Sequence, residues 1–115
     1  MNERKLINID EALERFGGAK DLYDSLALMF IDDSDFAPEK LDALLSENKT
    51  DEACSYVHKL KGVCGTLGCE LLFDSTKDFC DIARNRISGS LLDCAKEVKN
   101  NYEITMKKFH EMYQK

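Results

Sequence analysis

The sequence has no tryptophan and only one proline among its 115 residues. This composition is more typical of a helical chain than of a turn-rich β-sheet protein. No apolar run approaches the roughly 18 residues that a membrane span requires. The N-terminus, Met-Asn-Glu-Arg-Lys, lacks the apolar core of a signal peptide. We therefore expect a cytoplasmic protein that does not associate with a membrane.

Basic residues are fewer than acidic ones, 16 against 22, which leaves a net charge of -6. Nucleic acid is therefore not expected as a partner, because phosphate backbones attract basic surfaces. The chain also has no Gly-x-x-x-x-Gly-Lys loop and no Gly-rich nucleotide lid. We expect no ATP site, and hence no kinase activity of its own.

The five cysteines are odd in number and contain no Cys-x-x-Cys pair. This usage is typical of free thiols in a reducing compartment. Cys54 and His58 share a helical face four residues apart, which is half of a conceivable metal site. No second ligand pair has zinc-like spacing, so we expect no bound metal.

Apolar residues recur at alternating steps of three and four through most of the chain, and no run shows the alternation of a strand. The pattern predicts helices near 10–16, 19–32, 36–47, 50–67, 70–84 and 90–113. Short connections favour antiparallel neighbours. We therefore predict an all-α fold: an up-and-down four-helix bundle formed by the last four helices, with the two N-terminal ones lying against or capping it. Residues 1–115 are expected to form one domain.

Several helix ends carry recognisable signals. Asp10 is predicted to cap the first helix and Thr50 the fourth, while Gly17 and Gly68 are expected to end them. Pro38 is tolerated in the first turn of the third helix. The second helix is expected to bury one apolar face, made of Leu22, Leu26, Met29 and Phe30.

The last predicted helix has the longest regular period in the chain. Its four-three pattern covers Leu91, Ala95, Val98, Tyr102, Thr105, Phe109 and Met112. Such a seam can support one side of a bundle, and we expect a monomer on that basis. The same heptad pattern is also compatible with a coiled-coil dimer.

The stretch 53–68 combines a core seam with an unusual exposed stripe. Ala53, Val57, Leu60, Cys64 and Leu67 share the apolar face. His58 lies off that face, with Lys61, Gly62 and Gly65 at i+3, i+4 and i+7. Glycine inside a helix costs about 1 kcal/mol relative to alanine, so these two give up stability for open space around His58. An accessible imidazole beside a cation suits phosphoryl transfer. A plain exposed histidine, with glycines that admit a neighbouring helix, fits the same spacing.

The string His58-Lys59-Leu60-Lys61-Gly62, followed by Gly65 and Gly68, resembles the core motif of the histidine-containing phosphotransfer (HPt) family. Residues 9–18 resemble the short N-terminal helix of that family and its Gly turn, and 78–84 resemble a later helical segment. In that segment Cys80 replaces the usual Glu, which puts a structural contact in doubt.

The resemblance implies a phosphorelay intermediate. His58 would be the phosphoacceptor, and Lys61 and Lys59 would stabilise charge on the phosphoryl group. Gly62 and Gly65 would admit the partner, with Cys54 and Cys69 near the same docking surface. The implied partners are response-regulator receiver domains and a hybrid sensor histidine kinase. No cofactor is expected on this chain, because magnesium would belong to the receiver.

Three other functions remain compatible with the sequence. One is an HPt-like interaction module whose His58 is never phosphorylated. The others are a thiol or metal protein and a coiled-coil adaptor.

Overall fold

The computed structural model describes residues 3–114, and that part of the chain contains six helices and no strand. The helices are α1 (Ile9–Arg15), α2 (Lys20–Asp33), α3 (Pro38–Ser46), α4 (Thr50–Leu67), α5 (Glu70–Ala83) and α6 (Leu91–Tyr113). The predicted all-α class is confirmed, and each predicted helix lies within a few residues of an observed one. None of these helices combines the length and the hydropathy needed to cross a bilayer.

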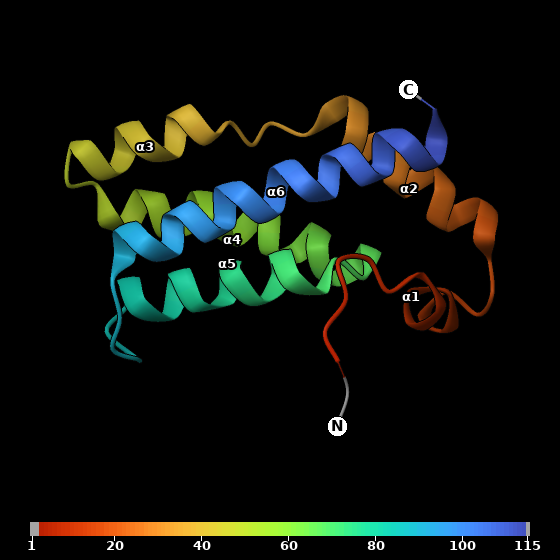
Figure 1. Ribbon diagram of the computed structural model, residues 1–115, viewed down its shortest axis with the longest axis horizontal. Coiled ribbons are helices and arrows are strands. Elements are labelled where there is room, and N and C mark those ends of the chain that lie inside the picture. Colours follow the sequence, from red (N-terminus) through yellow and green to blue (C-terminus); the bar gives the residue numbers. More distant parts are fainter. Residues whose placement is uncertain (1–2, 115) are drawn as a thin grey trace.

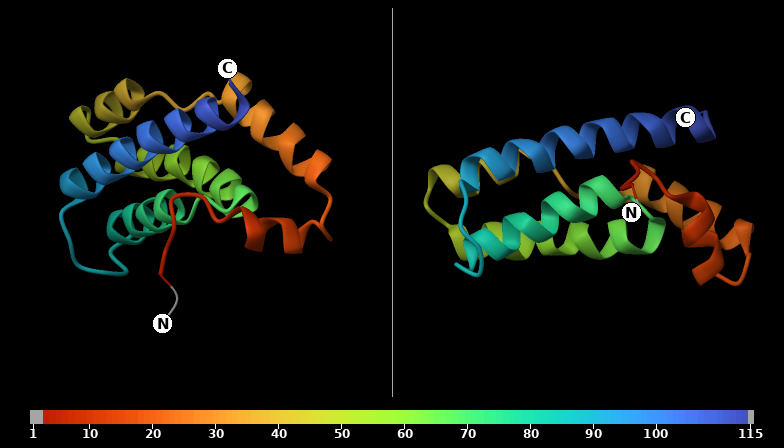
Figure 2. Two further views of the ribbon diagram at one scale, coloured as in Figure 1. Left: turned by 45° about the vertical axis from the view of Figure 1, so that its right-hand side comes forward. Right: turned by 60° about the horizontal axis from the view of Figure 1, so that its bottom comes forward.

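Helices α4, α5 and α6 run up and down side by side along the long axis of the molecule (Figure 1). Helix α3 packs against α4 and α6 at one end, and α2 packs against the same two helices at the other. The two shorter helices thus share the fourth position of the bundle. This refines the prediction for 19–32, because α2 contributes buried side chains to the core as well as covering it. Both views in Figure 2 show α1 beside α2, at the end where α4 turns into α5.

The buried face of α2 agrees with the predicted one at Phe30 but not at Leu22 and Met29. Leu22 and Met29 are 50% and 57% exposed, whereas Tyr23, Ala27 and Phe30 are buried. The two stripes lie one residue apart on the helix, so both are apolar and the local pattern does not rank them. Packing against α4 and α6 selects the stripe that contains the aromatic rings.

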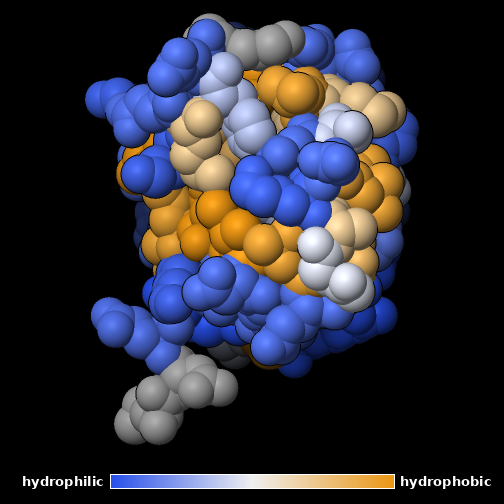
Figure 3. All heavy atoms as spheres, turned by 90° about the vertical axis from the view of Figure 1, so that its right-hand side faces the viewer, coloured by the Kyte–Doolittle hydropathy of each residue, from blue (hydrophilic) through white to orange (hydrophobic). Residues whose placement is uncertain are grey.

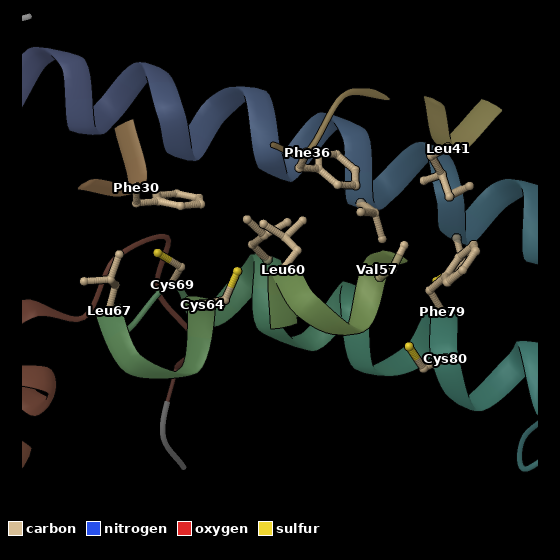
Figure 4. Close-up of a cluster of buried hydrophobic side chains, with 14 of the residues drawn as sticks. Phe30, Phe36, Leu41, Val57, Leu60, Cys64, Leu67, Cys69, Phe79 and Cys80 are labelled. Carbon is tan, nitrogen blue, oxygen red and sulfur yellow. The ribbon is translucent and has the colours of Figure 1, made fainter. Parts of the chain in front are cut away.

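The seam of α6 packs inside the molecule. Ala95, Val98, Thr105 and Phe109 are buried, and Phe109 packs edge-on to Phe30 of α2. Figure 4 shows the core beneath α6, formed by labelled side chains of α2, α4 and α5 and of the chain between Phe36 and Leu41. A coiled-coil dimer through this seam is therefore wrong, because other helices of the same chain already cover it.

Two of the predicted caps are wrong. Asn8, not Asp10, caps α1, and its side-chain oxygen accepts the N–H of Glu11 at 3.2 Å. Thr50 is the first residue of α4 and makes no capping hydrogen bond, since Lys49 occupies the cap position. The predicted roles of Gly17, Pro38 and Gly68 are confirmed.

The N-terminal segment holds the turn between α4 and α5. The N–H of Asn8 donates to the carbonyl of Gly68 at 2.7 Å. The carboxylate of Glu70, whose side chain is 9% exposed, accepts the N–H of Lys5 at 2.8 Å and the amide of Asn8 at 3.1 Å. Arg4 adds an ion pair to Asp74 at 2.9 Å. Residues 4–8 are therefore tied to the end of α4 and the start of α5 by buried and charged contacts.

Gly68 satisfies two constraints at once, and we expect Gly68→Ala to be strongly destabilising. Its φ is +76°, and an added Cβ would lie 2.6 Å from the carbonyl oxygen of Asn8. Gly17 has a φ of +63° but open space around it, so Gly17→Ala isolates the cost of the backbone conformation. Urea denaturation should give a loss of about 1 kcal/mol for Gly17→Ala and about 3 kcal/mol for Gly68→Ala. Equal losses would contradict the close approach of Asn8.

Acid should weaken the attachment of the N-terminal segment. Burial alone would raise the pKa of Glu70, but hydrogen bonds from Lys5 and Asn8 and the charge of Arg4 outweigh it and hold the pKa below its usual range. A lowered carboxylate pKa stabilises the folded state above the unfolded pKa, and this stabilisation is lost as the pH falls through the folded pKa.

The measurement compares the unfolding free energy of the wild type with that of Glu70→Gln at pH 6 and pH 3. We expect the wild type to be more stable by about 1 kcal/mol at pH 6 and the difference to shrink at pH 3. A difference that does not change with pH would exclude the charged form of Glu70 as the stabilising group.

Candidate functional site

His58 lies near the middle of α4, on the face opposite the core. Its side chain is exposed, whereas the preceding Val57 is 0% exposed. Within residues 3–114 the imidazole makes no hydrogen bond or ion pair with another side chain. Because α4 buries one full face against the other helices, His58 projects from a packed support and its side chain is open to solvent.

Lys59 and Lys61 lie on opposite sides of His58. Lys59 is exposed and borders a cleft between α2 and α4. Lys61 is half-buried, and its Nζ lies 5.6 Å from the centroid of the Phe73 ring of α5. This cation–π contact keeps the ammonium on the α5 side of the stripe. Both predicted lysines are thus near His58, in different surroundings.

The two glycines of the stripe have different surroundings. Gly62 is exposed, and a Cβ added to it would meet no atom within 4 Å. A Cβ on Gly65 would lie 3.4 Å from Cε2 of Phe73, which is ordinary contact. The open space expected from the sequence is therefore found one turn after His58, while Gly65 lies beside an aromatic ring.

Cys54 and Cys69 do not belong to the exposed surface, which corrects their predicted place in partner docking. They are 2% and 0% exposed, because Cys54 faces α5 and Cys69 lies in the turn beneath the N-terminal segment. The Sγ of Cys80 donates to the carbonyl of Cys54 at 3.5 Å, so Cys80 forms a buried contact between α4 and α5.

The pKa values of the buried Cys64 and Cys80 thiols are raised. Burial, followed by a hydrogen bond with Cys54, raises the pKa of Cys80 to about 12. A hydrogen bond with Cys69, followed by burial, raises the pKa of Cys64. Because the thiolate is the reactive form, these groups are poor nucleophiles and poor metal ligands. Among the described residues, no three His, Cys, Asp or Glu side chains are grouped as metal ligation requires.

A cleft of about 360 Å³ lies between α2 and α4, and Lys59, the residue after His58, is at its edge. We call it the α2–α4 cleft. Its α4 wall includes Lys59, Val63 and Thr66, and its α2 wall includes Leu26 and Met29. Val63 is 38% exposed and Met29 is 57% exposed. The cleft therefore presents apolar side chains to solvent on the side of α4 that Lys59 borders.

The apolar lining of the cleft continues along α2. Of the four residues predicted to form the buried face, Leu22 and Met29 face solvent, Leu26 is half-buried, and Phe30 is buried. Figure 3 views the end of the molecule that carries α1 and α2, and it shows apolar side chains gathered on this surface among polar ones. The apolar pattern of α2 is visible in the sequence, but it predicted a buried face and not an exposed one. Two adjacent apolar stripes on one helix are the clue that one of them remains uncovered.

Residues before and within α2 cap the C-terminal end of α4. The last carbonyls of a helix have no partner within it. Here the carbonyl of Gly65 accepts Nη2 of Arg15 at 2.6 Å, and that of Leu67 accepts the hydroxyl of Tyr23 at 2.7 Å. Sequence reasoning did not identify Arg15, because the two groups that it joins are 50 residues apart.

Comparison with known proteins identifies the family of the chain. A family model described as Hpt domain matches residues 25–114, which is most of the sequence. The match includes α4 with the whole His58 stripe, and it leaves α1 and the first turn of α2 outside. No curated protein and no solved structure matched the chain.

Proposed function

The chain belongs to the Hpt domain family, and from that membership we propose that it is a phosphorelay intermediate whose phosphoacceptor is His58. Domains of this family carry phosphoryl groups on histidine and work with receiver domains and histidine kinases. The observation that carries the proposal is the exposed imidazole of His58 beside the open space at Gly62. A docked partner can therefore bring an acyl phosphate to the ring without displacing a side chain.

The transfer reaction requires an unprotonated ring nitrogen. In the proposed reaction the lone pair of Nε2 attacks the phosphorus of an aspartyl phosphate on the receiver, in line with the bond that breaks. The N–P bond forms, the P–O bond breaks, and its electron pair leaves with the aspartate carboxylate. The proton on Nδ1 is not needed for the displacement and can exchange with water. Because both phosphorylated groups are high in energy, the phosphoryl group can then pass to a second receiver.

Lys59 and Lys61 would stabilise the negative charge on the equatorial oxygens. Lys61 is three residues from His58, and its flexible stem allows the ammonium to leave the Phe73 ring for the phosphoryl group. Magnesium would be held by the receiver.

The docking surface would consist of the His58 stripe and the neighbouring α2–α4 cleft. Exposed Met29 and Val63 offer apolar area that a monomer leaves uncovered. Gly62 lets the partner's backbone approach α4 closely. Receiver domains, alone or attached to a hybrid sensor kinase, are thus the proposed partners, and the chain itself would be a carrier without an ATP site.

The test is transfer of labelled phosphate from a panel of phosphorylated receiver domains to the wild type, His58→Gln and His110→Gln. His110 is also exposed and is the only other histidine, so it is the matched control. We expect acid-labile, alkali-stable label on the wild type and on His110→Gln, and none on His58→Gln. Receiver binding without any label would favour a silent interaction module. Labelling from ATP without a partner would contradict the carrier role.

Gly62→Gln tests the need for open space. The substitution should stabilise the protein by up to about 1 kcal/mol, because it removes a glycine from a helix interior where nothing lies within 4 Å of the new Cβ. The longer side chain should nevertheless slow transfer from the receiver by about tenfold, as it occupies the space one turn from His58. Gly62→Ala is the control, with similar stability and nearly normal transfer. Equal transfer rates for Gly62→Gln and the wild type would contradict the need for open space at Gly62.

A further inference from the structure

Arg15 connects the N-terminal helix to the functional face of α4. Its Nη2 donates to the carbonyl of Gly65 at 2.6 Å and lies 3.5 Å from that of Thr66. Its Nη1 donates to Glu11 at 2.8 Å. The guanidinium is therefore fixed through both Nη1 and Nη2. It lies at the end of the stripe that contains His58 and Gly65.

The capping role does not use the whole guanidinium. Arginine has five N–H donors in a planar fork, and the bonds named above leave its Nε–H for another acceptor. The side chain remains 45% exposed. A charged group that is held rigidly yet reaches solvent loses little side-chain entropy when a partner binds to it.

The exposed charges along α4 change sign from one end to the other. Asp51 and Glu52 lie in its first turn, before His58, whereas Lys59 and Lys61 follow it. Arg15 extends the positive half by a further turn, although it comes from a different helix. The exposed side chains of α4 are thus acidic at its start and basic after His58, while Glu11 partly offsets the charge of Arg15 near its end.

Arg15 is too far along the helix to act on the phosphoryl group itself. Gly65 follows His58 by seven residues, which is about 10 Å at 1.5 Å per residue. A typical protein interface covers about 800 Å² on each partner, which is a patch roughly 30 Å across. A domain centred on His58 therefore reaches Arg15 without placing it at the reacting atoms.

We propose that Arg15 is a partner-recognition residue that binds an acidic side chain of the docked receiver. This inference rests on the proposed function. The receiver's phosphorylated aspartate and the carboxylates that bind its magnesium make the approaching surface acidic, and the positive half of the α4 stripe complements it. Complementary charge at the edge of an interface mainly affects encounter and orientation, and it leaves the chemical step unchanged.

The proposal assigns recognition to a part of the chain outside the family match. Residues 25–114 contain His58 and its lysines, whereas Arg15 precedes them. The phosphotransfer face would thus be completed by the N-terminal segment, which also caps α4. Loss of that segment should weaken partner binding as well as the fold.

The experiment uses the full chain and the phosphorylated receiver domain from the panel that transfers fastest to the wild type. The variants are Arg15→Gln, Arg15→Lys and Lys20→Gln, and the last removes one exposed cation that pairs with Asp24 on its own helix. We expect Arg15→Gln to raise the KM for the receiver about tenfold, with an unchanged rate at saturation and an unchanged phosphohistidine lifetime. The KM of Arg15→Lys should stay within about threefold of the wild-type KM, and the KM of Lys20→Gln should equal the wild-type KM.

Glu11→Gln tests the same inference without removing the cap. Because the Glu11 carboxylate lies 2.8 Å from Nη1, its neutralisation makes the site more positive and should lower the KM about twofold. This variant keeps the inference falsifiable even if Arg15→Gln does not fold.

The outcomes separate the two proposals. If the wild type is labelled on His58 while Arg15→Gln keeps a normal KM and only loses thermal stability, Arg15 is a cap alone and the inference is overturned. A slower rate at saturation would also overturn it, since Arg15 would then act on the chemistry. If no receiver labels the wild type, the proposed function fails and this inference fails with it.

Discussion

The turn between α4 and α5 at Gly68 is the constraint on which the rest of the structure depends. Its left-handed backbone ends α4, and the carbonyl of Asn8 approaches it so closely that a side chain would not fit. Because α4 and α5 share the most extensive contact in the molecule, this turn also fixes their register. The register places Phe73 beside Gly65 and Lys61, and Cys80 beside Cys54. The surroundings of His58 therefore depend on a turn ten residues away.

Helix α4 packs in the core with one face and presents His58 to solvent with the other. One face is buried by α2, α3 and α5 and supplies much of the core, including Val57 and Leu60. This burial offsets the cost of the glycines on the exposed face, which the helix would not tolerate as readily in isolation. The exposed imidazole is consequently held in place without any hydrogen bond of its own in the described structure. Such an open position suits the phosphoacceptor role proposed for His58.

Local charge matters more for this surface than the net charge of the chain. A net charge of -6 argues against a polyanionic partner such as nucleic acid. Lys59 and Lys61 nevertheless bring positive charge beside His58, and Arg15, paired with Glu11 at 2.8 Å, lies further along the same helix. Screening limits charge effects to about 8 to 10 Å at physiological ionic strength, so an approaching domain responds mostly to these nearby groups. The acidic residues elsewhere keep the surface from attracting anionic partners over its whole area.

The sequence alone determined the six helices and the stripe that carries His58, because turn signals such as Gly68 and the periodicity of α4 act between residues close in the chain. It did not determine which apolar stripe of α2 is buried, since both stripes satisfy the same pattern and only packing on α4 and α6 separates them. The burial of Cys54 and Cys69 was decided in the same way, by α5 and the N-terminal segment. Arg15 became part of the α4 surface through a contact across 50 residues. A helix sets its faces locally, but its distant neighbours decide which face is covered.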